Sequence, residues 1–280
     1  MASYRYVVCD VFTTVPLAGN QLAVFTDARE IPEDRLQALA RELNFSETSF
    51  VYPPEGDGHV RMRIFTPARE VPFAGHPALG TAFVLAAPLQ LGEIRIETRR
   101  GTIPVRLERD GVRISFGWME QPLPEVSDFA DAEALLAALG VERSELPVQR
   151  YDNGIPHVYV TLPSEEGVAA LRPDSAALER VGDVCANCVA GAGSRWKTRM
   201  FAPGHGVHED PATGSAAGPL ALHLARHGRI GWGEEVVISQ GAEICRPSTL
   251  YARVLGDGGR VERIEVGGAA VVVARGEFRL

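Results

Sequence analysis

Short segments of apolar or alternating residues, separated by Gly, Pro or Asp, run through the whole chain. Such segments are typical of β-strands, whose side chains point alternately to the two faces of a sheet. In the first half they lie at 4–12, 22–26, 49–53, 60–66, 94–101, 103–110 and 112–118. In the second half they lie at 157–163, 199–203, 235–241, 250–256, 264–268 and 270–278. Both halves are therefore predicted to consist mainly of strands.

Two amphipathic helices interrupt the strands. In 33–43 the apolar residues recur at helical spacing, and Asn44 can adopt the left-handed conformation that ends a helix. The segment from Asp131 to Gly140 shows the same periodicity, and in the chain it lies near the junction of the two halves.

Two further helices are apolar nearly all round, which marks them as buried. The first covers 78–87, directly after Pro77, and the second covers 215–228. Because Pro219 lies inside the second, we expect a kink there or a helix start later than Pro211.

The two buried helices belong to a longer internal repeat. The segment 65–83 (FTPAREVPFAGHPALGTAF) resembles 201–217 (FAPGHGVHEDPATGSAA) at an offset of 201 − 65 = 136, which shifts to 214 − 80 = 134 further along. An offset close to half of 280 residues predicts a duplication. In this alignment His76 falls on Asp210, so the two residues are predicted to face each other across a cleft.

These patterns predict an α+β fold of two pseudo-symmetric domains. Their expected boundaries are 1–118 and 119–280, with the last strand, about 268–280, able to return to the first domain. Each domain is predicted to be an antiparallel, β-barrel-like sheet around one central apolar helix. The active site is expected in the cleft between the domains.

Composition narrows the classes of partner. With 45% hydrophobic residues the chain can bury two cores, and its net charge of −8 disfavours nucleic acid and anionic membranes as partners. A small anionic substrate needs only a local positive site and stays compatible. No apolar run approaches the ~20 residues that span a bilayer, and no signal-peptide pattern opens the chain. We therefore expect a cytoplasmic protein.

Cysteine and glycine motifs offer little support for a cofactor. Cys185 and Cys188 form a CxxC, but no second ligand pair completes a zinc site, and buried, inert thiols are a stronger interpretation than a redox dithiol. The stretch GAGSRW at 191–196 lacks the third glycine and the acidic residue of a dinucleotide fingerprint, so it is read as a turn. The sequence thus predicts neither a metal nor a nucleotide cofactor.

The small residues that begin the two buried helices predict a binding site. The first turn of a helix has free backbone N–H groups and a partial positive charge, and small side chains let an anionic ligand reach them. The segments PFAGHP at 72–77 and EDPATGSAAGP at 209–219 have this composition.

With NFSETSF at 44–50, these motifs resemble the phenazine-biosynthesis isomerase family, which is related in fold to diaminopimelate epimerase. The similarity extends over essentially the whole chain, including AGNQLAVF, RMFAP and LARHGRI. It implies a homodimeric isomerase that shifts a proton on trans-2,3-dihydro-3-hydroxyanthranilate, a small anionic, cyclic, amino-acid-like substrate, without metal or organic cofactor. The family's acid/base residues fall on Glu47, His76 and Asp210.

Further site residues follow from the same motifs. Ser46, Gly75, Gly214 and Ser215 are expected to contact the substrate carboxylate, with Asn20 as an additional candidate. Glu47 is the expected proton shuttle, because a carboxylate in an enclosed cleft can exchange protons near neutral pH.

Structural alternatives stand beside these roles. From local sequence alone, Glu47 could be a solvated loop acid, His76 a helix-capping histidine and Asp210 a helix N-cap. His205, His208, His223 and His227 are interpreted as surface or packing residues.

Three rival functions remain open. A racemase or epimerase of this fold uses a cysteine on each side of the substrate carbon, and the motifs here lack both thiols. Another proton-shift isomerase on an amino-acid-like substrate is not excluded by that absence. A catalytically inactive small-molecule binding protein would have little need for all three ionisable residues. NMR assays of proton exchange with candidate substrates separate these alternatives.

Overall fold

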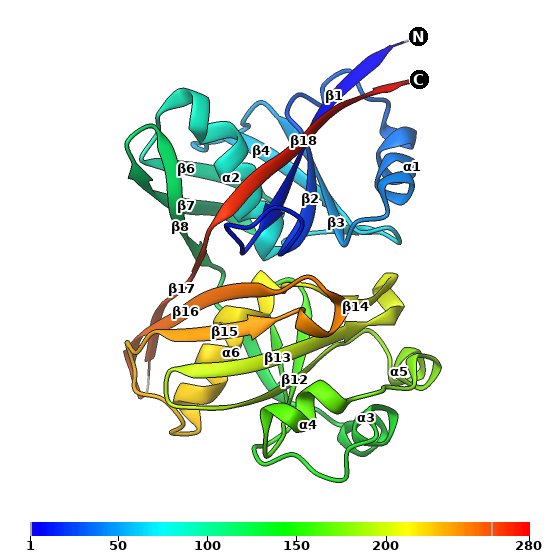
Figure 1. Cartoon of the computed structure of the whole chain (residues 1–280), viewed down its shortest axis with the longest axis vertical. Coiled ribbons are helices and arrows are strands. Elements are labelled where there is room, and N and C mark those ends of the chain that lie inside the picture. Colours follow the sequence, from blue (N-terminus) through cyan, green and yellow to red (C-terminus); the bar gives the residue numbers. More distant parts are fainter. Residues whose placement is uncertain (1, 259) are drawn as a thin grey trace.

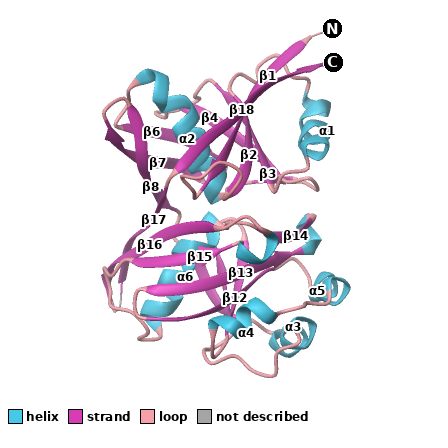
Figure 2. Ribbon diagram, in the orientation of Figure 1, coloured by secondary structure: helices cyan, strands magenta, loops and turns pink. Residues whose placement is uncertain are grey.

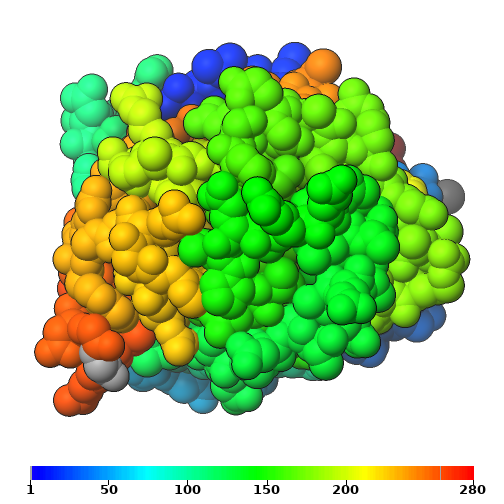
Figure 3. Space-filling view, turned by 90° about the horizontal axis from the view of Figure 1, so that it is seen from below, coloured from blue at the N-terminus to red at the C-terminus, as the bar shows by residue number. Residues whose placement is uncertain are grey.

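The computed structural model describes residues 2–258 and 260–280. The molecule consists of two halves stacked along its long axis, and the two ends of the chain lie together at the top (Figure 1). Strands form most of both halves, with one long helix at the centre of each (Figure 2). Seen from below, the surface is formed mostly by the C-terminal half (Figure 3).

The described residues of the N-terminal half form nine strands. These are β1 (Ser3–Val11), β2 (Asn20–Phe25), β3 (Glu47–Tyr52), β4 (Val60–Phe65), β5 (Glu70–Val71), β6 (Glu93–Thr98), β7 (Gly101–Asp110), β8 (Arg113–Gln121) and β18 (Ala270–Arg279). They pair in the order β18-β1-β2-β3-β4-β6-β7-β8, with β5 added to β4. The pairs β2–β3 and β4–β6 are parallel.

The C-terminal half repeats this arrangement. Its strands are β9 (Glu125–Asp128), β10 (Gln149–Asp152), β11 (Pro156–Thr161), β12 (Cys185–Ala192), β13 (Arg195–Ala202), β14 (Val207–Asp210), β15 (Val236–Gln240), β16 (Ser248–Asp257) and β17 (Arg260–Gly268). They pair in the order β9-β10-β11-β12-β13-β15-β16-β17, with β14 on β13 and with β11–β12 and β13–β15 parallel. The predicted duplication is confirmed, and it extends to the positions of the parallel pairs.

Two features of the predicted sheets are wrong. The sheets are mixed instead of antiparallel, because a helical or looped crossover joins each parallel pair. They also do not close into barrels. The end of β8 pairs with the end of β17, and residues 117–119 of β8 pair with β7 and β17 at once, so both halves of the described chain belong to one 18-stranded sheet.

The helices largely follow the sequence pattern. They are α1 (Glu33–Leu43), α2 (Gly75–Leu89), α3 (Ala132–Leu139), α4 (Glu165–Ala170), α5 (Ser175–Val181) and α6 (Gly214–Arg226), with short 3₁₀ turns at Pro203–His205 and Ala242–Ile244. Asn44 ends α1 with φ of 53°, as predicted. Helix α2 starts three residues before its predicted range, and α6 starts beyond Pro211, as predicted. Helix α3 packs against α5 at the outer end of the molecule, away from the junction (Figure 1).

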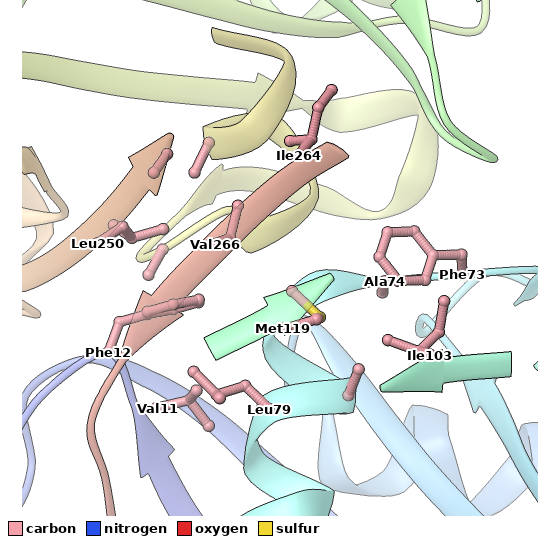
Figure 4. Packing of buried hydrophobic residues seen from close by; sticks show 14 of the residues in the cluster. Val11, Phe12, Phe73, Ala74, Leu79, Ile103, Met119, Leu250, Ile264 and Val266 are labelled. Atoms are coloured by element: carbon pink, nitrogen blue, oxygen red, sulfur yellow. The ribbon is translucent and has the colours of Figure 1, made fainter. Parts of the chain in front are cut away.

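A continuous apolar core joins the two halves. Val11, Leu79 and Met119 of the N-terminal half belong to the same buried cluster as Leu250 and Val266 of the C-terminal half (Figure 4). Helices α2 and α6 are enclosed by the sheets, which explains why both are apolar nearly all round. The core therefore holds the N-termini of the two helices at the junction.

Candidate active site

The N-termini of α2 and α6 meet backbone to backbone at the junction. A Cβ atom on Gly75 would lie 2.4 Å from the backbone carbon of Gly214 and 2.4 Å from the backbone nitrogen of Ser215. Any larger residue would force the helix ends apart, so glycine is required at this contact. The small-residue motifs serve this close approach as well as access to the helix amides.

The starts of α2 and α6 show that the two halves align differently from the sequence-based alignment of 65–83 with 201–217. Gly75 and Gly214 are the first residues of the two helices, at an offset of 214 − 75 = 139. His76 therefore corresponds to Ser215. Asp210 ends strand β14, ahead of the helix, so the predicted equivalence of His76 and Asp210 is wrong.

A small cavity of about 20 Å³ lies beside the two helix ends. Six of the eight predicted site residues line it: Glu47, Gly75, His76, Asp210, Gly214 and Ser215. Among the described residues that line it there is no lysine or arginine. Helix amides and neutral donors are therefore the groups available to an anion in this cavity.

Glu47 is the first residue of β3 and contributes an acid to the cavity. Its side chain is 14% exposed, and its Oε2 lies 3.3 Å from Nδ1 of His76. Burial raises its pKa well above the ordinary value, and the nearby Asp210 carboxylate adds to the rise. The alternative of a solvated loop acid is wrong, because the residue lies in a strand with little solvent contact.

His76 is the second residue of α2 and is buried. Its Nδ1 lies 3.2 Å from Nδ2 of Asn20. Burial lowers the pKa of His76 to about 3, so the ring is neutral at pH 7. The N-cap of α2 is Ala74, and no side chain caps the helix. The capping alternative for His76 is therefore wrong.

Asp210 is held by three side-chain donors. Ser46 Oγ and Asn20 Nδ2 donate to Oδ1 over 2.6 and 2.9 Å, and Thr213 Oγ1 donates to Oδ2 over 2.7 Å. Burial raises the pKa of Asp210, although the three donors oppose the rise. The N-cap of α6 is Thr213, and no side chain makes a capping bond, so the N-cap alternative for Asp210 is wrong.

Ser46 and Asn20 do not line the cavity. They contact Asp210 from the N-terminal half, and Asn20 Nδ2 also donates to the backbone oxygen of Ala212 over 2.9 Å. The structure thus brings all eight predicted residues together, six around the cavity and two behind Asp210.

Several cavity residues escaped the sequence prediction: Thr66, Ile155, His157, Cys185, Met200 and His205. His205 was interpreted as a surface or packing residue, but it is buried and lines the cavity, with Nε2 2.6 Å from Oδ1 of Asp183. His157 lies in a strand that is buried along its whole length. Without alternation between apolar and polar residues, no local signal indicates which side chain faces the cavity.

The CxxC motif does not form a dithiol site. Cys185 and Cys188 are three residues apart on β12, so they point to opposite faces of the strand, and they belong to two different buried clusters. Both are free thiols, and burial raises the pKa of Cys188 to about 12. The predicted turn at 191–196 joins β12 to β13.

Neither a cluster of metal ligands nor a helix that could cross a membrane occurs in the described part of the chain. Across 2–258 and 260–280, no three or more His, Cys, Asp or Glu side chains gather as metal ligands. None of the helices found in these residues has the length and apolar character needed to cross a bilayer.

Comparison with known proteins gives a consistent result. A family model described as phenazine biosynthesis-like protein matches residues 9–276. The trans-2,3-dihydro-3-hydroxyanthranilate isomerase of Pseudomonas aeruginosa is 50% identical over 277 residues, which cover 99% of this chain and 100% of that protein. The phenazine biosynthesis protein of the PhzF family from Bacillus anthracis has a TM-score of 0.86 at 26% identity, over 100% of both chains. A hydroxyproline epimerase from Agrobacterium vitis shares the fold, with a TM-score of 0.69 at 12% identity, over 98% of this chain and 92% of that one.

Proposed function

The chain belongs to the phenazine biosynthesis-like protein family, and from this premise we propose that it is an isomerase acting on trans-2,3-dihydro-3-hydroxyanthranilate. The reaction moves a proton from the hydroxyl-bearing carbon of the ring to the carboxyl-bearing carbon on the same face. One observation carries the proposal above all: Glu47, His76 and Asp210 line one enclosed cavity at two converging helix N-termini.

Glu47 is the group that we propose carries the proton. Burial and the neighbouring Asp210 raise its pKa, which favours the protonated form that a shuttle needs when it returns the proton. It takes the proton from one carbon as a carboxylate and returns it to the other as an acid. Because the same group does both, the two carbons must lie on the same side of the ring as Glu47.

The negative charge that forms on the ring between the two steps spreads into the substrate carboxylate. The amides at the starts of α2 and α6 and the hydroxyl of Ser215 are placed to stabilise it. His76 is neutral at pH 7, and its Nδ1 lies 3.3 Å from Oε2 of Glu47. Asp210 adds a negative charge whose Coulombic effect helps to raise the pKa of Glu47.

Substrate entry requires movement. A cavity of about 20 Å³ is far below the ~300–1,000 Å³ that ligand sites usually provide. The segments that line the cavity therefore have to move before a six-membered ring can enter. Closure then removes water from the carboxyl group that moves the proton.

Racemisation fits the cavity less well. It needs one base on each face of the substrate carbon, and the helix starts offer Gly75–His76 and Gly214–Ser215 in place of thiols. Cys185 is the single thiol among the described lining residues, and burial raises its pKa. One such thiol does not make a pair.

Three organisational features accompany the proposal. We propose two domains divided near 118/119, with β18 paired to β1 in the first. A homodimer follows from the family resemblance, and sedimentation equilibrium tests it. A cytoplasmic location agrees with four free cysteines, which are typical of a reducing compartment, and cell fractionation tests it.

The direct experiment follows the substrate by proton NMR with the purified chain. We expect the ring signals of the substrate to disappear at a rate proportional to enzyme concentration. The same spectra in heavy water, recorded with proline and other amino acids, detect exchange at an α-carbon. Absence of substrate turnover, alongside exchange of an amino-acid α-proton, would favour the racemase. Binding without any exchange would favour the inactive binding protein.

A further inference from the structure

A chain of buried hydrogen bonds runs from β12 through β11 to the start of α6. Asn187 Nδ2 lies 2.8 Å from the backbone oxygen of Cys185 and 3.4 Å from Nδ1 of His157. His157 Nε2 lies 3.0 Å from Oγ of Ser215. Asn187, His157 and Ser215 are 1%, 0% and 3% exposed, so water does not compete for these contacts.

The donor and acceptor of each bond can be assigned by starting from the backbone oxygen of Cys185. A backbone oxygen can only accept, so the Asn187 atom that faces Cys185 is the amide nitrogen. That nitrogen can only donate, so Nδ1 of His157 is an acceptor. Burial lowers the pKa of His157 to about 3, which leaves the neutral ring with its one proton on Nε2. His157 therefore donates to the hydroxyl oxygen of Ser215.

Ser215 is thereby left with a hydroxyl hydrogen to give away. Its oxygen already accepts from His157, and the structure provides no acceptor for its hydrogen among the described residues. Ser215 lines the cavity as the second residue of α6. An anionic group in the cavity is the natural acceptor for that hydrogen.

We infer that His157 is a positioning residue, which holds the Ser215 hydroxyl as a donor to the carboxylate of the substrate. The inference rests on the proposed function for the identity of that carboxylate. It assigns a role to a residue that the acid/base motifs do not contain. The neighbouring Asn153 acts on a different atom, because its Nδ2 donates to the backbone oxygen of Ser215 over 2.9 Å.

A set of variants tests the direction of the relay. His157→Gln retains an amide N–H that can reach Ser215, whereas His157→Met has a comparable size and no donor. We expect Ser215→Ala to weaken binding of anthranilate, measured by titration calorimetry, by at least ~10-fold, because a hydrogen bond to a charged group is lost. The anthranilate affinity of His157→Met should be within ~3-fold of that of Ser215→Ala. His157→Gln should retain most of the wild-type affinity.

The double variant separates positioning from packing. In a Ser215→Ala background, His157→Met should weaken binding by less than ~2-fold further, because the hydroxyl that it orients is gone. Asn153→Leu serves as the matched control, since its effect should add to that of Ser215→Ala. Thermal melts of every variant report the stability that each change costs.

Two results would overturn the inference. The first is that the losses of anthranilate affinity caused by His157→Met and by Ser215→Ala add in the double variant. The second is that His157→Gln and His157→Met bind anthranilate with equal affinity. If the His157 variants do not fold, Asn187→Asp gives the second test. A carboxylate there accepts from Nδ1–H, reverses the ring's donor and acceptor, and should weaken binding as Ser215→Ala does. Retention of wild-type affinity by a folded Asn187→Asp would contradict the relay. Because anthranilate binding is measured without turnover, the outcome is independent of whether the proposed isomerisation occurs.

Discussion

Replacing Asp210 with asparagine separates a chemical role from a structural one. The amide keeps the size of the side chain and one of its two oxygens. If that oxygen takes the place of Oδ1, the bonds from Ser46 and Asn20 survive. The amide nitrogen then faces Thr213 Oγ1, 2.7 Å away, which already accepts a bond from Gln240 Nε2. The Thr213 hydroxyl hydrogen loses its acceptor.

The structural cost is therefore one hydrogen bond to a charged group, about 1.5–3 kcal/mol. A gain opposes this loss, because burial disfavours the Asp210 carboxylate, and a neutral amide removes that charge. We expect a net destabilisation of at most ~2 kcal/mol, which lowers Tm by less than ~8 °C. Because the Asp210 charge tunes the proton transfer by Glu47, we expect its removal to cost ~10²–10⁴-fold in rate, the range for general acid–base catalysis.

The assay combines thermal melts with turnover per folded molecule. Thr213→Val is the matched control, because it removes the same hydrogen bond and leaves the Asp210 charge in place. We expect similar melting temperatures for the two variants and a much larger rate loss for Asp210→Asn. The reasoning is refuted if Asp210→Asn turns over within ~10-fold of wild type, or if Thr213→Val loses as much rate.

Three further predictions concern other parts of the molecule. Exhaustive dialysis against a chelator should leave turnover unchanged, and activity restored by one particular divalent ion would contradict this. Cys188→Ala should keep the rate per folded molecule within ~2-fold, because the thiol lies in a cluster that does not line the cavity, and a ~100-fold loss would assign it a chemical role. His223→Phe should reduce the loss of stability in acid. The pKa of this buried histidine is about 3 in the folded protein, so the unfolded chain binds the extra proton as pH falls from 6.5 towards 3. Melts at pH 7.5 and pH 4.5 should show a smaller drop for the variant, and an equal drop would contradict the burial argument.

Local patterns were sufficient to predict four of the six described α-helices and most strands, whereas the short helices α4 and α5 were not predicted. Helix α1 is set by apolar spacing and by Asn44 at its end, and both features are contained in a dozen neighbouring residues. The eight predicted site residues also came together, because they lie in motifs that begin β2, β3, α2 and α6 or directly precede them. Helix α2 shows one limit of this reasoning, since its start at Gly75 lies against the distant Gly214.

Features that depend on pairing between distant strands were not predictable. The crossover from β2 to β3 makes that pair parallel, and no local sequence signal distinguishes it from an antiparallel pair. Cys185 begins β12 as Glu47 begins β3, so the duplicated fold places them at equivalent positions on the cavity. This equivalence is visible only after the strands are paired, because the two segments share no motif.

The proton shuttle is the central claim, and Glu47→Gln in heavy water tests it most directly. Glutamine keeps the shape of the side chain but cannot accept a proton from carbon, so we expect a rate loss of at least ~10³-fold with little change in anthranilate affinity. Glu209→Gln is the matched control, since its carboxylate pairs with Arg199 at 2.7 Å and does not line the cavity, and it should stay within ~3-fold of wild type.

The decisive measurement is the NMR spectrum of the product formed by wild type and Glu47→Gln in heavy water. The product formed by wild type should carry some deuterium at the carbon that gains hydrogen, because protonated Glu47 can exchange with solvent before it delivers its proton. The glutamine variant should form almost no product. Turnover by Glu47→Gln within ~10-fold of wild type, or loss of the proton shift in His76→Ala but not in Glu47→Gln, would contradict the shuttle.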